Sequence, residues 1–123
     1  MTTLLVIGLF GTGNIVICTP DTTEVYCICN EMTYSSFDAY ETNYGTVMDD
    51  VCAYTPMNGF NYYTSCFDCH GHGVCNGALT QSDCNECLKE ARDHLFNECR
   101  LRVGAQVQLK DCRIRYENYE FSE

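Results

Sequence analysis

The sequence predicts a single α+β domain in which two helices cover one face of an antiparallel sheet. Two stretches carry apolar residues at helical spacing and four others are typical of short strands, in the order β-α-β-α-β-β. No internal repeat or linker divides the 123 residues, which are enough for one buried core. Eleven cysteines, about 9% of the chain, are typical of an extracellular domain stapled by disulfides.

Residues 1–20 are predicted to form an apolar arm ahead of the domain, which covers residues 21–123. The run Leu4–Phe10 has the length of a signal-peptide core, but no Lys or Arg precedes it and no small-residue cleavage site follows. It is too short, and too closely followed by glycines, to span a membrane as a helix. The segment is expected to be retained and ordered. Its β-branched residues favour strands, either two short ones (Leu4–Phe10 and Asn14–Cys18) or one extended arm.

Two amphipathic helices are predicted from the apolar spacing. The first covers Ser35–Tyr54, where Ser35 and Asp38 have the spacing of a capping box. The second runs from about Asp83 to Cys99, with Thr80 or Ser82 as its N-cap. The first buried stripe consists of Phe37, Tyr40, Tyr44, Val47 and Val51. The second consists of Cys84, Cys87, Leu88, Ala91, Leu95 and Cys99.

The strands are predicted from alternating and β-branched residues. They cover Thr22–Asn30, Phe60–Phe67, Val103–Lys110 and Cys112–Glu120. A loop rich in glycine, histidine and cysteine is expected between Phe67 and Gly77. The side chains predicted to share an inward face are Val25, Cys27 and Cys29 in the first strand, Ala105, Val107 and Leu109 in the third, and Cys112, Ile114 and Tyr116 in the fourth.

The charge of the chain argues against two classes of partner. Its formal net charge is −10, which is the wrong sign for binding nucleic acid or an anionic membrane surface. All seven basic residues lie after Leu88, whereas residues 1–88 carry ten acids and no base. Separated charge of this kind favours head-to-tail contact between copies of the chain, although it is also typical of a solvated acidic face.

The cysteines allow three interpretations. Cys66 and Cys69, followed by Cys84 and Cys87, have nearly the spacing of a four-cysteine zinc site, and His70 and His72 lie nearby. The run Cys66–His70 also fits the C-x-x-C-H pattern of covalent haem attachment. The third interpretation, which this oxidised composition favours, is disulfide pairing. Because eleven is odd, at least one cysteine has no partner within the chain.

The spacing Cys75-x₈-Cys84-x₂-Cys87, followed by Cys99 and by GAQVQLKDCRIRYE over Gly104–Glu117, resembles the ginkbilobin-type (stress-antifungal) domain. Supporting matches are GFNYYTS at Gly59–Ser65 and the triplet SDC at residues 82–84. The resemblance extends over roughly Thr22–Phe121. Such domains occur in plant cysteine-rich secretory proteins, in plasmodesmata-located proteins and in receptor-like kinase ectodomains.

The resemblance implies a five-stranded antiparallel sheet with two helices and a secreted location. It also implies the pairings Cys29–Cys99, Cys75–Cys84 and Cys87–Cys112, each of which typically stabilises a domain by about 2–4 kcal/mol. Pairing Cys84 and Cys87 in this way removes the four-cysteine zinc site, so no metal or cofactor is predicted.

Five cysteines lie outside that framework. Cys27 shares a predicted face with Cys29 and could reach Cys52 near the end of the first helix. Cys18, Cys66 and Cys69 then remain, and one of them has no internal partner. An intermolecular disulfide through Cys18 or the Cys66–Cys69 loop is one hypothesis.

The resemblance further implies a site for mannose-type sugar made of three polar residues. By position these are Asn30, Glu117 and Gln106, the last standing where the family has arginine. Glutamine still donates hydrogen bonds, but it lacks the fixed charge and five donors of arginine, so a lost sugar site is as consistent with the sequence as a retained one.

The sequence predicts a non-catalytic protein, because it holds no nucleophile elbow, P-loop, dinucleotide-binding glycine motif or zinc-protease motif. Two functions remain, besides that of a receptor ectodomain fragment. The first is self-association, in which the arm adds a strand to a neighbouring copy and builds an oligomer or fibril. The second is glycan binding by a monomeric defence protein. The arm residues expected to mediate assembly are Leu4, Leu5, Val6, Ile7, Leu9, Phe10, Ile15, Ile17 and Cys18.

Overall fold

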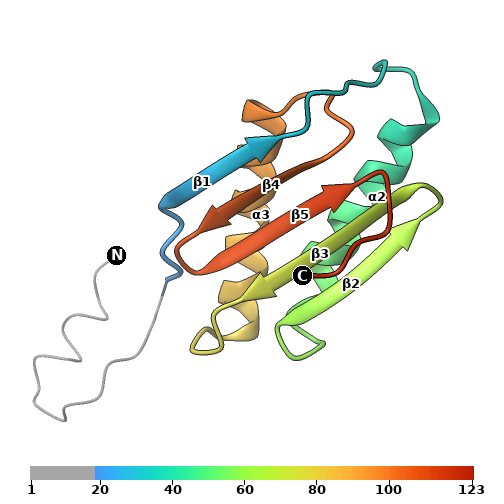
Figure 1. The fold of residues 1–123 in the computed structure, drawn as a ribbon. Coiled ribbons are helices and arrows are strands. Elements are labelled where there is room, and N and C mark those ends of the chain that lie inside the picture. Colours follow the sequence, from blue (N-terminus) through green and yellow to red (C-terminus); the bar gives the residue numbers. More distant parts are fainter. Residues whose placement is uncertain (1–18) are drawn as a thin grey trace, which may run out of the picture.

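The computed structural model describes residues 19–123, which form one sheet and two helices (Figure 1). The two predicted strands of the arm, and the arm residues expected to mediate assembly, lie outside the described residues. In chain order the elements are β1 (Glu24–Cys29), α2 (Ala39–Tyr54), β2 (Asn61–Cys66), β3 (Cys69–Cys75), α3 (Gln81–Glu98), β4 (Ala105–Leu109) and β5 (Cys112–Glu117). Neither helix has the length and apolarity that crossing a bilayer requires.

The sheet has five strands in the order β1-β4-β5-β3-β2, and every neighbouring pair is antiparallel. Both helices pack on the same face of the sheet, so no helix of residues 19–123 covers the opposite face (Figure 1). This confirms the predicted α+β architecture and leaves strands β1 and β2 at the two edges.

Helix α3 is covalently attached to the sheet at three places. Its C-cap residue Cys99 bonds to Cys29 of β1, Cys84 in its first turn bonds to Cys75 of β3, and Cys87 bonds to Cys112 of β5. These are the three pairings that the resemblance implied. The apolar stripe predicted for this helix is buried throughout, and Thr80 is its N-cap, accepting a hydrogen bond from the Asp83 backbone N–H at 3.1 Å.

The predicted Cys27–Cys52 bridge is wrong. Both residues are free thiols in the structure, as are Cys66 and Cys69. Cys27 instead lies beside α3, with its Sγ 3.7 Å from the Sγ of Cys99. Cys99 is already bonded to Cys29, which lies two residues after Cys27 in the same strand. Cys99 is therefore not available to Cys27.

The predicted loop between Phe67 and Gly77 is also wrong, because most of it is strand β3. A two-residue turn at Phe67 and Asp68 joins β2 to β3, with Phe67 at φ 54°. Gly71 and Gly73 face α2, where a Cβ on either residue would collide with a valine side chain of the helix. The glycines that suggested a loop are therefore the residues that let the helix approach the strand.

Helix α2 begins later than predicted. Asp38 is its N-cap and accepts a hydrogen bond from the Tyr40 backbone N–H at 2.9 Å, so the Ser35–Asp38 capping box is not formed. Phe37 precedes the cap and is fully exposed, although the spacing placed it in the buried stripe. Tyr40, Val47 and Val51 are buried as predicted, and Tyr44 is half-buried against the core.

Strand β1 departs from regular alternation. The pairing with β4 shifts between Glu24 and Tyr26, which is the signature of a bulge. Val25, predicted to face inward with Cys27 and Cys29, is 56% exposed for this reason. In β4 and β5 the alternation is regular, and all six side chains predicted to face inward are buried.

We predict that Gly73→Ala destabilises the domain. The added Cβ would lie 2.5 Å from Val51 Cγ1 and 2.6 Å from Thr55 Oγ1, and both residues are fully buried. Overpacking of this kind typically lowers the free energy of unfolding by about 1–3 kcal/mol. Urea denaturation with the disulfides intact measures the change.

Gly45→Ala is the matched control, because this glycine lies inside α2 with nothing within 4 Å of the added Cβ. Alanine should there raise the free energy of unfolding by about 0.5–1 kcal/mol through its helix propensity. Equal effects of the two substitutions would show that α2 does not press on β3 as described.

Candidate binding site

The face of the sheet without helices, here called the open face, is lined mainly by polar side chains. Because strand residues alternate between faces, the positions between the buried ones point away from the helices. One row runs straight across all five strands, since each of its members pairs with the next. This row consists of Ile28, Gln106, Arg115, His72 and Tyr63.

The three residues expected to bind sugar lie at one end of the open face. Asn30 follows β1, and its backbone N–H donates to the carbonyl of Gly104 at 2.8 Å, immediately before β4. The Asn30 side-chain oxygen accepts from the Met32 backbone N–H at 2.8 Å, which leaves the amide NH₂ for other partners. Glu117 ends β5 and packs over Gly104, where a Cβ would collide with its carboxylate.

Gln106 pairs directly with Arg115 across the β4–β5 ladder. A guanidinium therefore lies beside the position where the family has arginine, supplied by the neighbouring strand. The Nε of Arg115 donates to Glu117 Oε2 at 2.9 Å, which links it to the predicted trio. Sequence reasoning missed Arg115; the alternation of Arg113, Ile114 and Arg115 in β5 was the signal that would have placed it on the open face.

Arg115 is held by several groups at once. Its Nη1 donates to Glu123 at 3.1 Å, its Nη2 donates to the Tyr119 hydroxyl at 3.3 Å, and its guanidinium lies 4.2 Å from the centre of the Phe121 ring. Partial burial lowers the pKa of Arg115, but hydrogen bonds to Glu117 and Glu123 outweigh this and hold the pKa above its ordinary value. The open face therefore carries a permanent positive charge in a fixed orientation.

Residues 118–123, here called the tail, fold back over the open face (Figure 1). The carboxylate of Glu123 lies 2.8 Å from His72 Nδ1, and its backbone N–H donates to the Tyr63 hydroxyl at 2.8 Å. His72 is only 2% exposed, because the tail covers it and the Tyr63 ring stacks on it at 3.8 Å. Its Nε2 lies 2.6 Å from Asn61 Oδ1, so both ring nitrogens have partners within the domain.

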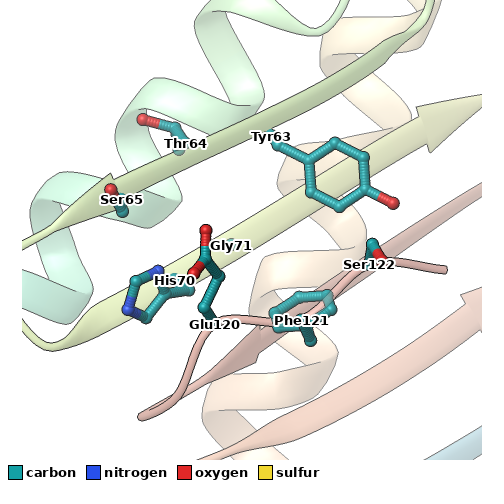
Figure 2. A pocket seen from close by; sticks show the side chains of 8 residues that line it. All are labelled: Tyr63, Thr64, Ser65, His70, Gly71, Glu120, Phe121 and Ser122. Atoms are coloured by element: carbon teal, nitrogen blue, oxygen red, sulfur yellow. The ribbon is translucent and has the colours of Figure 1, made fainter.

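A hollow of about 260 Å³ lies between the tail and the β2–β3 hairpin. In Figure 2, His70 and Glu120 border one side of it and the rings of Tyr63 and Phe121 border the other. His70 pairs with Glu117 in the β3–β5 ladder, so the hollow adjoins the end of the open face that holds the predicted trio. The remaining lining residues are Thr64, Ser65, Gly71 and Ser122.

The zinc and haem interpretations of the cysteines fail on this geometry. Cys84 and Cys87 are bound in disulfides and cannot complete a four-cysteine zinc site. Cys69 is buried on the helix side of β3, whereas His70 points to the open face, so the C-x-x-C-H run does not converge on one side.

Comparison with known proteins agrees with this geometry. The family model described as salt stress response/antifungal matches residues 26–119. The antifungal protein ginkbilobin-2 of Ginkgo biloba is 31% identical over 107 residues, covering 82% of this chain and 80% of the relative. The antifungal protein ginkbilobin-like protein 2 of Picea glauca is 34% identical over 106 residues, covering 81% and 80%.

Among solved structures, the tandem DUF26 ectodomain of the Arabidopsis thaliana cysteine-rich receptor-like protein PDLP8 superposes with a TM-score of 0.77 at 26% identity. The match covers 87% of this chain and 50% of that one, so the present chain spans half of the tandem ectodomain. These findings confirm the resemblance drawn from the cysteine spacing.

We predict that Glu123→Gln releases the tail from the open face at neutral pH. Burial raises the pKa of Glu123, but hydrogen bonds from His72 and Arg115 outweigh it and hold the pKa below the ordinary 4.5. A carboxylate with a depressed pKa stabilises its contacts above the ordinary value, and this stabilisation is lost as the pH falls through the depressed value. Acidification should therefore loosen the tail of the native chain but change the tail of Glu123→Gln little.

Backbone ¹⁵N relaxation of residues 119–123, together with the His72 ring signals, measures this release. Glu120→Gln is the matched control, because Glu120 lies in the same tail and its side chain makes no hydrogen bond or ion pair with the described residues. A tail that stays ordered in Glu123→Gln, or that loosens equally in Glu120→Gln, would contradict the role given to Glu123.

Proposed function

This chain belongs to the salt stress response/antifungal family, and we propose that it is a non-catalytic binding module that takes a mannose-type sugar at the end of its open face. The domain is extracellular, as its three disulfides and the secretory and ectodomain proteins among its relatives indicate. The proposed sugar-binding residues are Asn30, Gln106, Arg115 and Glu117.

The observation that carries the proposal is the position of Arg115 beside Gln106. The sequence puts glutamine where the resemblance expects arginine, and the pairing of β4 with β5 supplies a guanidinium from the next strand. A sugar ring presents several hydroxyls, each of which both donates and accepts hydrogen bonds. The site offers a carboxylate that accepts, a guanidinium that donates and two amides that do both.

The surroundings of these residues also suit a small polar ligand. Arg115 and Glu117 are positioned by their own ion pair, and Gly104 leaves room for the carboxylate. Binding sites commonly combine a concave, partly aromatic surface with a few positioned polar groups. The hollow beside His70, with Tyr63 and Phe121 on its far side, offers such a surface next to Glu117.

The relatives named above as antifungal proteins suggest the biological use of such binding. We propose that this chain likewise acts in defence, by binding sugar outside the cell.

We predict that Arg115→Gln weakens binding of methyl mannoside at least about tenfold, because each lost charge-assisted hydrogen bond contributes roughly 1.5–3 kcal/mol. Arg113→Gln is the matched control: it makes the same change of charge on the same strand and face, one row away beside Gln108. Calorimetric or NMR titration gives both affinities. Gln106→Arg should strengthen binding in the native background.

Equal losses of affinity in Arg115→Gln and Arg113→Gln would mean that sugar binding depends only on the net charge of the face and not on the position of Arg115. A native chain that binds no mannoside would refute the proposed function.

Self-association is a second candidate function, favoured by the edge strand β1. Its outer surface is apolar and exposed, with Val25 at 56% and Ile28 at 54%, and Met32 continues the surface beyond the strand. A strand at the edge of a sheet has unpaired backbone groups that accept another strand. We propose that an apolar arm from a neighbouring copy pairs here, which would give a head-to-tail oligomer or fibril.

We predict that the full chain forms particles heavier than its 13.9 kDa by light scattering, and that removal of residues 1–20 returns it to a monomer. Ile28→Lys should also abolish assembly, because a charge on an edge strand opposes pairing. Phe96→Lys, which adds the same charge at a 50% exposed apolar residue of α3, should leave assembly unchanged. Monomers in every case would refute this candidate.

A further inference from the structure

Four side chains with metal-binding atoms meet where β1 packs against α3. Glu24 and Cys27 come from the strand, and His94 and Glu98 come from the helix. The carboxylate oxygens of the two glutamates and the Cys27 Sγ all lie within 4.8 Å of one another. His94 Nδ1 lies 2.6 Å from Glu24 Oε1 and 3.4 Å from Glu98 Oε2.

The bulge in β1 creates this arrangement. In a regular strand, residues three apart point to opposite faces, so Glu24 and Cys27 would not face the same helix. The shift in register between Glu24 and Tyr26 adds one position, and both side chains reach α3. His94 and Glu98 are four residues apart, so they lie on one side of that helix.

These donors match the chemistry of a borderline divalent metal. Zinc binds thiolate, imidazole and carboxylate ligands at about 2.0–2.3 Å, usually in a tetrahedron. Ligand atoms in such a tetrahedron lie roughly 3.3–3.6 Å from one another. The two His94 distances are 2.6 and 3.4 Å, and the three separations among Glu24, Cys27 and Glu98 lie within 4.8 Å, so side-chain rotations would be needed to bring the four donors around one ion.

We propose that Glu24, Cys27, His94 and Glu98 form a binding site for a divalent transition-metal ion of the zinc class. The site is separate from the open face, because Cys27 and the helix lie on the other side of the sheet. It therefore does not depend on the proposed sugar binding.

The charges around the cluster are consistent with this assignment. Among the described residues, the only cationic group in an ion pair with Glu24 or Glu98 is His94. The two carboxylates lie close together and repel each other when both are ionised, and a divalent cation between them would remove this repulsion.

Metal at this site would fasten an otherwise weakly held strand. Among the strands that the structure describes, β1 pairs with β4 alone, and the Cys29–Cys99 disulfide attaches it to α3. An ion held by two residues of β1 and two of α3 would add a second cross-link between the same elements, beside this disulfide, because Cys27 Sγ lies 3.7 Å from Cys99 Sγ. The fold would then be stabilised by metal through mass action.

Titration of the disulfide-intact full chain with Co²⁺, after removal of metals by chelation, tests the proposal. Cobalt bound to a thiolate in a tetrahedral site gives a sulfur-to-metal charge-transfer absorption and intense visible bands, both of which Zn²⁺ should abolish by displacement. We expect these bands at one equivalent, and a higher Tm in the presence of Zn²⁺.

Cys27→Ser should remove the charge-transfer band, and His94→Gln should weaken cobalt binding at least about tenfold while retaining that band. Cys66→Ser is the matched control: Cys66 is also a half-buried free thiol on the helix side, but it lies at the β2–β3 turn. Its cobalt spectrum should equal that of the native chain. A native chain without the thiolate band, or a band that survives in Cys27→Ser, would overturn the proposal.

Discussion

Three disulfides between α3 and the sheet are the constraint on which the rest of the structure depends. They join one helix to β1, β5 and β3, which lie in the first, third and fourth positions of the sheet. Each bond restricts the unfolded chain and holds one strand against the same helix. The disulfides therefore fix which face of the sheet α3 covers. α2 packs on that side too, so the opposite side is left to polar side chains and the tail.

The covered face achieves its close packing through small residues opposite large ones. Gly71 and Gly73 let Val47 and Val51 of α2 approach the middle of β3, and cysteines take the place of larger apolar side chains along α3. The same strand carries His72 on its other side, held by Asn61, Tyr63 and Glu123. β3 thus contributes to the buried core on one face and to the open face on the other.

The sequence predicted the elements that rest on periodicity and missed those that rest on contacts between distant residues. The stripe of α3 and the alternation of β4 and β5 were visible because each repeats within a single segment. β3 was missed because glycine disfavours strands locally, and the contact with α2 that requires glycine is not encoded nearby. The bulge at Glu24 was equally hidden, and it explains the exposure of Val25. Asn30, Gln106 and Glu117 came from resemblance alone, whereas Arg115 became apparent only from the pairing of β4 with β5.

Arg115 links the tail to the open face through a limited number of donors. A guanidinium has five N–H groups, and three of them are directed to Glu117, Glu123 and Tyr119, which leaves two. A ligand that takes only those two donors would leave the hydrogen bonds to the tail intact. A ligand that needs more must compete with Glu123 or Tyr119, and binding is then coupled to release of the tail and exposure of His72. The number of hydrogen bonds that a ligand takes from Arg115 therefore decides whether the tail stays on the open face or is released when the ligand binds.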